Sequence, residues 1–180
     1  MHIDLMRDRA RNLPAFSQPL EVQSMRIWHC KYDSLDGTRV LRNLEILVIA
    51  TWPDQTFDTL RYLKNLTYLS ILHLPHVTDL SPLAMLVNLQ SLSLSTLPSW
   101  DASGRRTTVE SLEPICRLPK LRHLELFGVV PKDKSLSPLH SIKTLETARF
   151  SKFPREEIDR FYETSRVLNK SVPEPNFSGA

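Results

Sequence analysis

Leucines recur along this chain in a fixed frame. The clearest copy reads L-x-x-L-x-x-L-x-L and places them at Leu86, Leu89, Leu92 and Leu94. With the second position as a marker, the frame falls on residues 22, 44, 66, 89, 121 and 145, in steps of 22, 22, 23, 32 and 24. A period of roughly 20–29 residues predicts stacked repeats, each with one short strand and a short helical or turn-like return. The single long step indicates an insertion of about ten residues, placed at 99–108.

The same frame predicts positions that were not used to find it. Nine residues before each marker stand Leu13, Leu35, Phe57, Leu80, Leu112 and Leu136. Six residues before it stand Phe16, Thr38, Leu60, Leu83, Ile115 and Leu139. All of these except Thr38 are apolar. Each return segment therefore carries its own layer of core side chains.

The sequence resembles the leucine-rich-repeat family over roughly residues 13–153. The segment Asp79-Leu80-Ser81-Pro82-Leu83, which leads into Leu86, is most similar to the short class of about 22 residues per repeat. That class includes bacterial internalins and the regulatory leucine-rich subunit of type-1 protein phosphatase. The resemblance implies an α/β solenoid with a parallel sheet on the concave face and turns or short helical segments on the convex face. It also implies that the concave face binds proteins.

One slot departs from the family pattern. Eight residues after the marker the family commonly has Asn or Cys, whose side chain satisfies backbone groups in the turn. Only Cys30 fits; the other copies are Trp52, Leu74, Leu97, Val129 and Phe153. Most corners instead pair an apolar residue with proline, as in Trp52-Pro53. Since proline lacks an N–H donor and has a fixed φ, we expect a ladder of apolar plugs in these turns.

The repeats need caps at both ends, because a stacked unit exposes its core there. We expect a single domain over residues 1–170, with an N-terminal cap at 1–12 and about six repeats at 13–153. Ile3 and Leu5 lie one period before Met25 and Ile27, which predicts an extra strand. A capping helix is expected at 154–170, ending near Asn169, with an apolar stripe of Ile158, Phe161, Val167 and Leu168. Residues 171–180 are expected to form a flexible tail.

Composition and charge favour a soluble protein-binding domain. Apolar residues make up 41% of the chain and charged residues 24%, with a net charge of +3 and no dense basic run, which disfavours nucleic acid as a partner. No stretch is apolar enough to span a membrane, and Met1–Arg11 has no signal-like apolar core. Cys30 and Cys116 are too far apart in the stack for a disulfide, so we expect a cytoplasmic protein with reduced thiols.

Candidate chemistry is sparse. The pair His73 and His76, with Asp79 nearby, lacks a third His or a Cys and is expected to be a surface pair rather than a metal site. Nucleophile elbows, P-loops and dinucleotide-binding glycine motifs are missing from the sequence. We therefore predict no catalytic residues, no metal and no cofactor, and a function other than enzymatic.

The outward-facing strand residues are the candidate binding site. Alternation along each strand sends the residues that flank the core leucines to the concave face. That face gathers arginines beside apolar and aromatic groups, which are typical anchors of protein contacts. The alternatives are that a curved sheet tolerates apolar residues at these positions, or that a cap or loop covers them. The candidates are Arg26, Trp28, Ile46, Val48, Tyr68, Leu72, Glu125, Phe127 and Arg149.

The insertion at 99–108 supplies a second candidate contact. It carries Trp100, Arg105 and Arg106 on an otherwise polar segment that we expect to be a loop. The alternative is that Trp100 folds back onto the solenoid.

Three functions fit the sequence. The first is a protein-binding module, in one version a bacterial immunity protein that neutralises a toxin domain. The second is a regulatory or adaptor subunit of an enzyme such as a phosphatase. The third and least favoured is nucleic-acid binding, whose test is a steep salt dependence.

Overall fold

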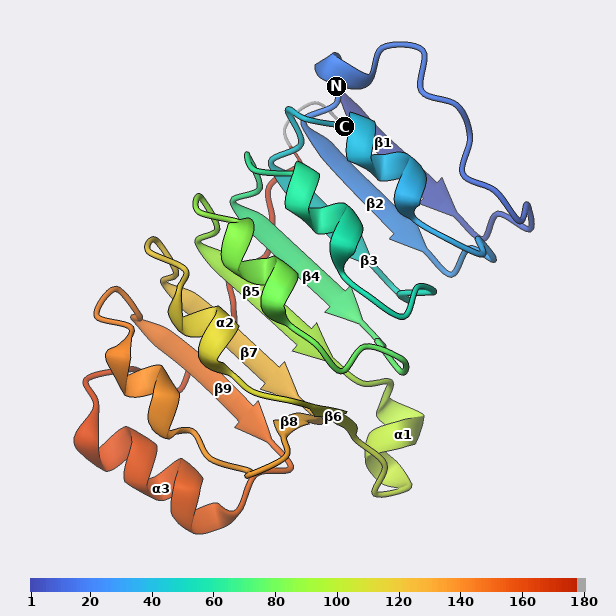
Figure 1. Cartoon of the computed structure of the whole chain (residues 1–180). Coiled ribbons are helices and arrows are strands. Elements are labelled where there is room, and N and C mark those ends of the chain that lie inside the picture. Colours follow the sequence, from blue (N-terminus) through green and yellow to red (C-terminus); the bar gives the residue numbers. More distant parts are fainter. Residues whose placement is uncertain (178–180) are drawn as a thin grey trace.

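The main sheet follows the repeat frame from end to end. The computed structural model describes residues 1–177. Figure 1 shows a 7-stranded sheet in the order β1-β2-β3-β4-β5-β7-β9, and every neighbouring pair is parallel. The strands are β1 (His2–Met6), β2 (Ser24–Trp28), β3 (Ile46–Ile49), β4 (Tyr68–Leu72), β5 (Ser91–Ser95), β7 (His123–Phe127) and β9 (Thr147–Ser151).

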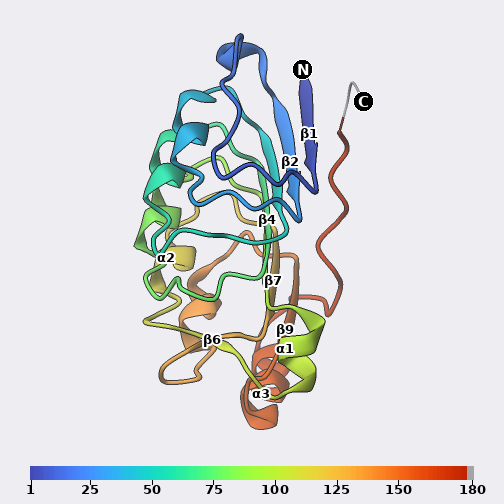
Figure 2. The same ribbon diagram turned by 90° about the vertical axis from the view of Figure 1, so that its right-hand side faces the viewer.

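The return segments lie along one side of this sheet (Figure 2). Each return element is only three to five residues long. Proline occupies the first turn of several of them, where its missing N–H is not needed. Leu60, Leu83 and Leu139 point from them into the core and are at most 1% exposed. The returns are η1 (Pro19–Glu21), η2 (Asp36–Val40), η3 (Asp58–Tyr62), η4 (Ser81–Met85), α2 (Glu113–Cys116) and η5 (Ser137–Ser141).

The core lies between the sheet and the returns. Leu47, Leu69 and Leu92 occupy one position on successive strands, pair in register and are at most 1% exposed. Each such side chain contributes roughly 1.5–3 kcal/mol by leaving water. The predicted solenoid and its strand register are confirmed.

The corners between strand and return are plugged as predicted. Trp52, Leu74 and Phe153 are buried, whereas Leu97 is only partly buried. The indole Nε1 of Trp52 donates to the carbonyl of Thr56 at 3.0 Å, so its one polar atom is satisfied inside the corner. The apolar ladder in the turns is therefore confirmed at these positions.

The caps differ from expectation at the C-terminal end. The predicted N-terminal strand is present, with Ile3 and Leu5 opposite Met25 and Ile27. The capping helix α3 (Arg155–Thr164) ends well before the predicted position near Asn169, because Ser165 is already extended at φ −114° and ψ 164°. The chain then turns back and pairs through Leu168 with Thr147 on the open edge of β9.

Leu168 consequently leaves the apolar stripe assigned to it. Its N–H donates to the carbonyl of Glu146 and its carbonyl accepts from the N–H of Ala148, while its side chain is 53% exposed. The backbone pairing covers hydrogen-bonding groups that an edge strand would otherwise present to solvent. Phe161 and Ile158 keep their predicted places against the core.

The insertion is ordered rather than a loop. It forms helix α1 (Pro98–Ala102) and then strand β6 (Thr107–Val109), which pairs in parallel with β8 (Val129–Pro131) in a small second sheet. Thr107 Oγ1 donates to the carbonyl of Leu74 at 3.3 Å, which ties the insertion to an earlier repeat. The inserted residues therefore form a short helix at the side of the stack (Figure 1) and rejoin the stack at β6.

Candidate functional site

The concave face, meaning the outward side chains of the seven strands, carries the columns that alternation predicts. The register places Trp28 of β2 beside Met6, and Ile46 of β3 between Ser24 and Tyr68. Leu72 and Phe127 lie on either side of Ser95. The central column reads Asp4, Arg26, Val48, Ser70, Ser93, Glu125 and Arg149. The structure thus brings the predicted concave residues onto one surface.

Both arginines of that column are paired with carboxylates. The Arg26 guanidinium donates to Asp4 and holds the pKa of that carboxyl below its ordinary value. Arg149 lies 3.7 Å from the Glu125 carboxylate and 4.8 Å above the ring centroid of Phe127. Ser93 Oγ donates to Glu125 at 3.1 Å. The face therefore presents little uncompensated charge to a partner.

The apolar candidates on β2, β3 and β4 are half-buried rather than fully exposed. Ser93 points to the same face but is only 7% exposed. Burial raises the pKa of Tyr68 to about 12, with the charges of Glu125 and Glu174 adding to the effect. Glu174 belongs to the C-terminal segment, so that segment lies near Tyr68.

The C-terminal segment covers part of the concave face, as in the alternative that a cap or loop lies over these residues. Figure 2 shows it leaving the region of β9 and running along the concave face, opposite the returns, toward the N-terminus. Ser171 Oγ accepts from Arg149 at 2.9 Å. The ring of Phe177 lies 4.7 Å from the ring of His2 and 6.0 Å from the Arg26 guanidinium carbon. These contacts differ from the expected flexible tail over residues 171–177; residues 178–180 lie outside the described part.

Comparison with solved structures identifies the architecture. An internalin C2 from Listeria monocytogenes superposes with a TM-score of 0.57 at 18% identity, over 84% of this chain and 71% of that one. An internalin, InlF, from the same bacterium gives a TM-score of 0.52 at 19% identity, over 90% of this chain. The fold is a leucine-rich-repeat solenoid.

The likeness is one of fold alone, because identity is below 20% in both pairs. Only 51% of the InlF chain is covered, so the present solenoid spans about half its length. No model of a known protein family matches this sequence, and no curated protein matches it significantly. The roles of individual concave residues must therefore come from the geometry of this solenoid.

Trp100 packs onto the leucine-rich-repeat stack. Its ring stands edge-on to the imidazole of His73, with centroids 4.7 Å apart and an interplanar angle of 79°. Arg105 places its guanidinium carbon 5.9 Å from the same indole, and Arg106 is exposed. Trp100 therefore folds back onto the solenoid, which is the alternative to a role as a partner contact. The two arginines remain on the surface beside it.

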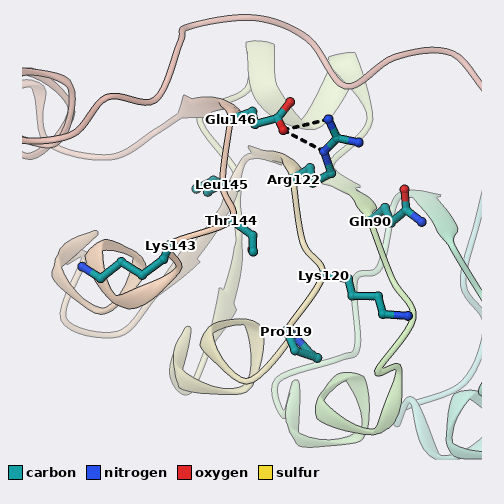
Figure 3. Close-up of a pocket in the computed structure, with 8 residues that line it drawn as sticks. All are labelled: Gln90, Pro119, Lys120, Arg122, Lys143, Thr144, Leu145 and Glu146. Carbon is teal, nitrogen blue, oxygen red and sulfur yellow. Dashed lines mark hydrogen bonds and ion pairs between the residues drawn. The ribbon is translucent and has the colours of Figure 1, made fainter.

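A separate hollow of about 500 Å³ opens where the chain enters β7 and β9. Figure 3 shows Arg122 and Glu146 pointing toward each other across it, while Lys120 and Lys143 point apart. Arg122 donates to Glu146 at 2.8 Å and Lys120 donates to Asn88 at 2.8 Å. Lys120, Arg122 and Glu146 therefore each already have a hydrogen-bond partner within the chain.

Chemistry-bearing residues elsewhere are dispersed. Within residues 1–177, no three His, Cys, Asp or Glu side chains converge as metal ligands would, and no helix is long and apolar enough to cross a bilayer. Cys30 and Cys116 are free thiols. Sequence reasoning missed Val172, Pro175 and Phe177 as concave-face residues. The only available signal was apolar residues interspersed in an otherwise polar, proline-containing tail.

Proposed function

We propose that this solenoid is a non-enzymatic module that binds a partner protein through its concave face. The observation that carries the proposal is the group Trp28, Ile46, Val48, Tyr68 and Leu72, gathered on adjacent strands. Aromatic and aliphatic anchors of this kind supply most of the binding energy at protein contacts. The paired states of Arg26 and Arg149 disfavour a polyanion such as nucleic acid.

Within this proposal two versions differ in what happens to the partner. An immunity protein blocks a toxin domain in a tight one-to-one complex. A regulatory subunit positions an enzyme such as a phosphatase and changes its activity. The leucine-rich-repeat architecture is compatible with either version, and the partner's activity measured in the complex separates them. The free cysteines support a reducing, cytoplasmic setting.

The test begins with affinity capture on the full chain, followed by titration of the purified partner. Trp28→Ala and Tyr68→Ala are each expected to weaken binding about tenfold or more, as loss of a central anchor does. Tyr62→Ala is the matched control, since Tyr62 lies on η3 among the returns and is 47% exposed. Equal affinity of all three variants for the partner would disprove a concave binding face.

A further inference from the structure

The C-terminal segment Ser171–Phe177 crosses most of the concave face. It is anchored at Arg149 on β9 and ends beside Arg26 on β2. Five interstrand steps separate those strands, about 24 Å at 4.8 Å per step. Six residue steps span at most about 20–22 Å, and the Arg149 and Phe177 side chains supply the remaining reach. The segment must therefore run almost fully extended across the strands.

Its side chains divide between the sheet and solvent. Val172, Pro175 and Phe177 are half-buried, whereas Pro173 and Asn176 are exposed. The half-buried set is apolar, which matches the apolar side chains and paired charges of the face beneath. Glu174, the one acidic residue of the segment, is exposed. The face therefore selects apolar groups spaced along an extended chain.

The backbone of the segment is held differently from a strand. Within residues 1–177, no backbone hydrogen bond joins residues 171–177 to the sheet. Two of these residues are prolines, which lack an N–H donor and favour extended backbone before binding. A segment of this kind loses little conformational entropy when it docks. Because the described residues fix it to the sheet by no backbone hydrogen bond, another peptide of similar chemistry can replace it.

We infer that the concave face is a groove for an extended, proline-containing peptide with apolar contact residues, and that Ser171–Phe177 is its occupant within this chain. The inference rests on the proposed function and specifies the partner as a protein that presents such a segment. The partner and the C-terminal segment then compete for one surface.

The test uses a fluorescently labelled peptide with the sequence of residues 170–177, added to the full-length protein. Val172→Ser combined with Phe177→Ser weakens the chain's own occupant without adding charge. This variant is expected to bind the peptide about tenfold more tightly than the wild-type chain does. Asn169→Ser combined with Asn176→Ser changes two exposed residues, one just before the segment and one within it, and is expected to match the wild type. A scrambled peptide is expected to bind neither protein.

A second measurement follows the docked segment directly. Phe177 faces His2 at 4.7 Å, so its ring current shifts the His2 imidazole protons in the NMR spectrum, and Phe177→Leu is expected to remove that shift. Equal peptide binding by all variants, or an unchanged His2 resonance, would overturn the inference. A His2 shift that grows with protein concentration would also overturn it, because the occupant would be a second copy's tail.

The two proposals can fail separately. If peptide binding follows the predicted order but no partner depends on Trp28 or Tyr68, the groove is supported and the proposed function is rejected. A partner that needs both residues but does not compete with the peptide would do the reverse.

Discussion

The indole of Trp100 closes one side of the His73 imidazole, with the two ring centroids 4.7 Å apart. His73 follows β4 in a left-handed conformation at φ 73° and is 9% exposed, and its Nδ1 has no hydrogen-bond partner among the described residues. Burial, followed by the nearby charge of His76, lowers the pKa of His73. The insertion that delivers Trp100 therefore contributes to the burial that lowers the pKa of His73.

Removal of that cover is expected to raise the pKa of His73 toward its ordinary value of about 6.5. Trp100→Ala opens the ring to water, which stabilises the charged form. The measurement is an NMR titration of the His73 imidazole protons. Trp100→Phe keeps an aromatic edge in place and is expected to retain most of the lowered pKa. The same pKa in wild type and Trp100→Ala would mean that the indole does not shield His73.

The lowered histidine pKa also fixes the direction of a pH effect on stability. Burial lowers the pKa of both His73 and His123 in the folded state. The unfolded chain therefore takes up protons first as pH falls below about 6.5. The contribution of the two histidines to the free energy of unfolding is therefore fully present above about pH 6.5. It is lost as the pH falls toward their folded-state pKa.

We therefore expect a lower urea midpoint at about pH 5.5 than at about pH 7.5. His73→Asn tolerates the left-handed backbone and removes one of the two groups, so its midpoint should change less between the two conditions. Carboxylates titrate mainly below this window. An identical pH dependence in the variant would assign the effect to His123 or other groups.

The columns of the concave face could be predicted because two periods suffice to specify them. A repeat of constant length sets which residues are neighbours across strands, and alternation within a strand sets which of them face outward. A period of 22 residues by itself puts Arg26 and Val48 side by side, and the register agrees. The apolar corners at Trp52 and Leu74 followed from the same frame.

The C-terminal segment and the insertion could not be predicted in the same way. Val172 and Phe177 have no repeat partners, and their contacts with distant strands depend on the completed sheet. The end of α3 at Thr164 also depends on tertiary pairing, since Leu168 pairs with the open edge of β9 instead of continuing the helix. Local patterns carry no information about such an edge until the strand beside it is in place.

Gly128, which follows β7, is expected to tolerate no side chain. Its φ is +68°, and an added Cβ would lie 2.3 Å from the Oγ1 of Thr96 in the neighbouring repeat. The left-handed backbone costs roughly 1–2 kcal/mol with alanine, and the overlap adds about 1–3 kcal/mol. Gly128→Ala should therefore destabilise the protein by about 2–5 kcal/mol in urea unfolding.

Gly104 is the matched control for this substitution. Its φ is +75°, but nothing lies within 4 Å of an added Cβ. Gly104→Ala should therefore show the backbone cost alone, roughly 1–2 kcal/mol. Thr96→Ala is expected to recover part of the loss in the Gly128→Ala background by removing the nearest atoms. Equal losses for the two alanine variants would show that contact with Thr96 does not matter.

Trp52 tests whether the apolar corners are structural. It is 1% exposed, and its indole meets Phe57 edge-on at 4.9 Å. Trp52→Ala leaves a cavity between repeats and is expected to cost about 3–5 kcal/mol of unfolding free energy. Trp52→Phe keeps the ring contact but loses the bond to the Thr56 carbonyl, so about 1–2 kcal/mol is expected. If both substitutions leave the urea midpoint unchanged, the corner does not depend on its apolar plug.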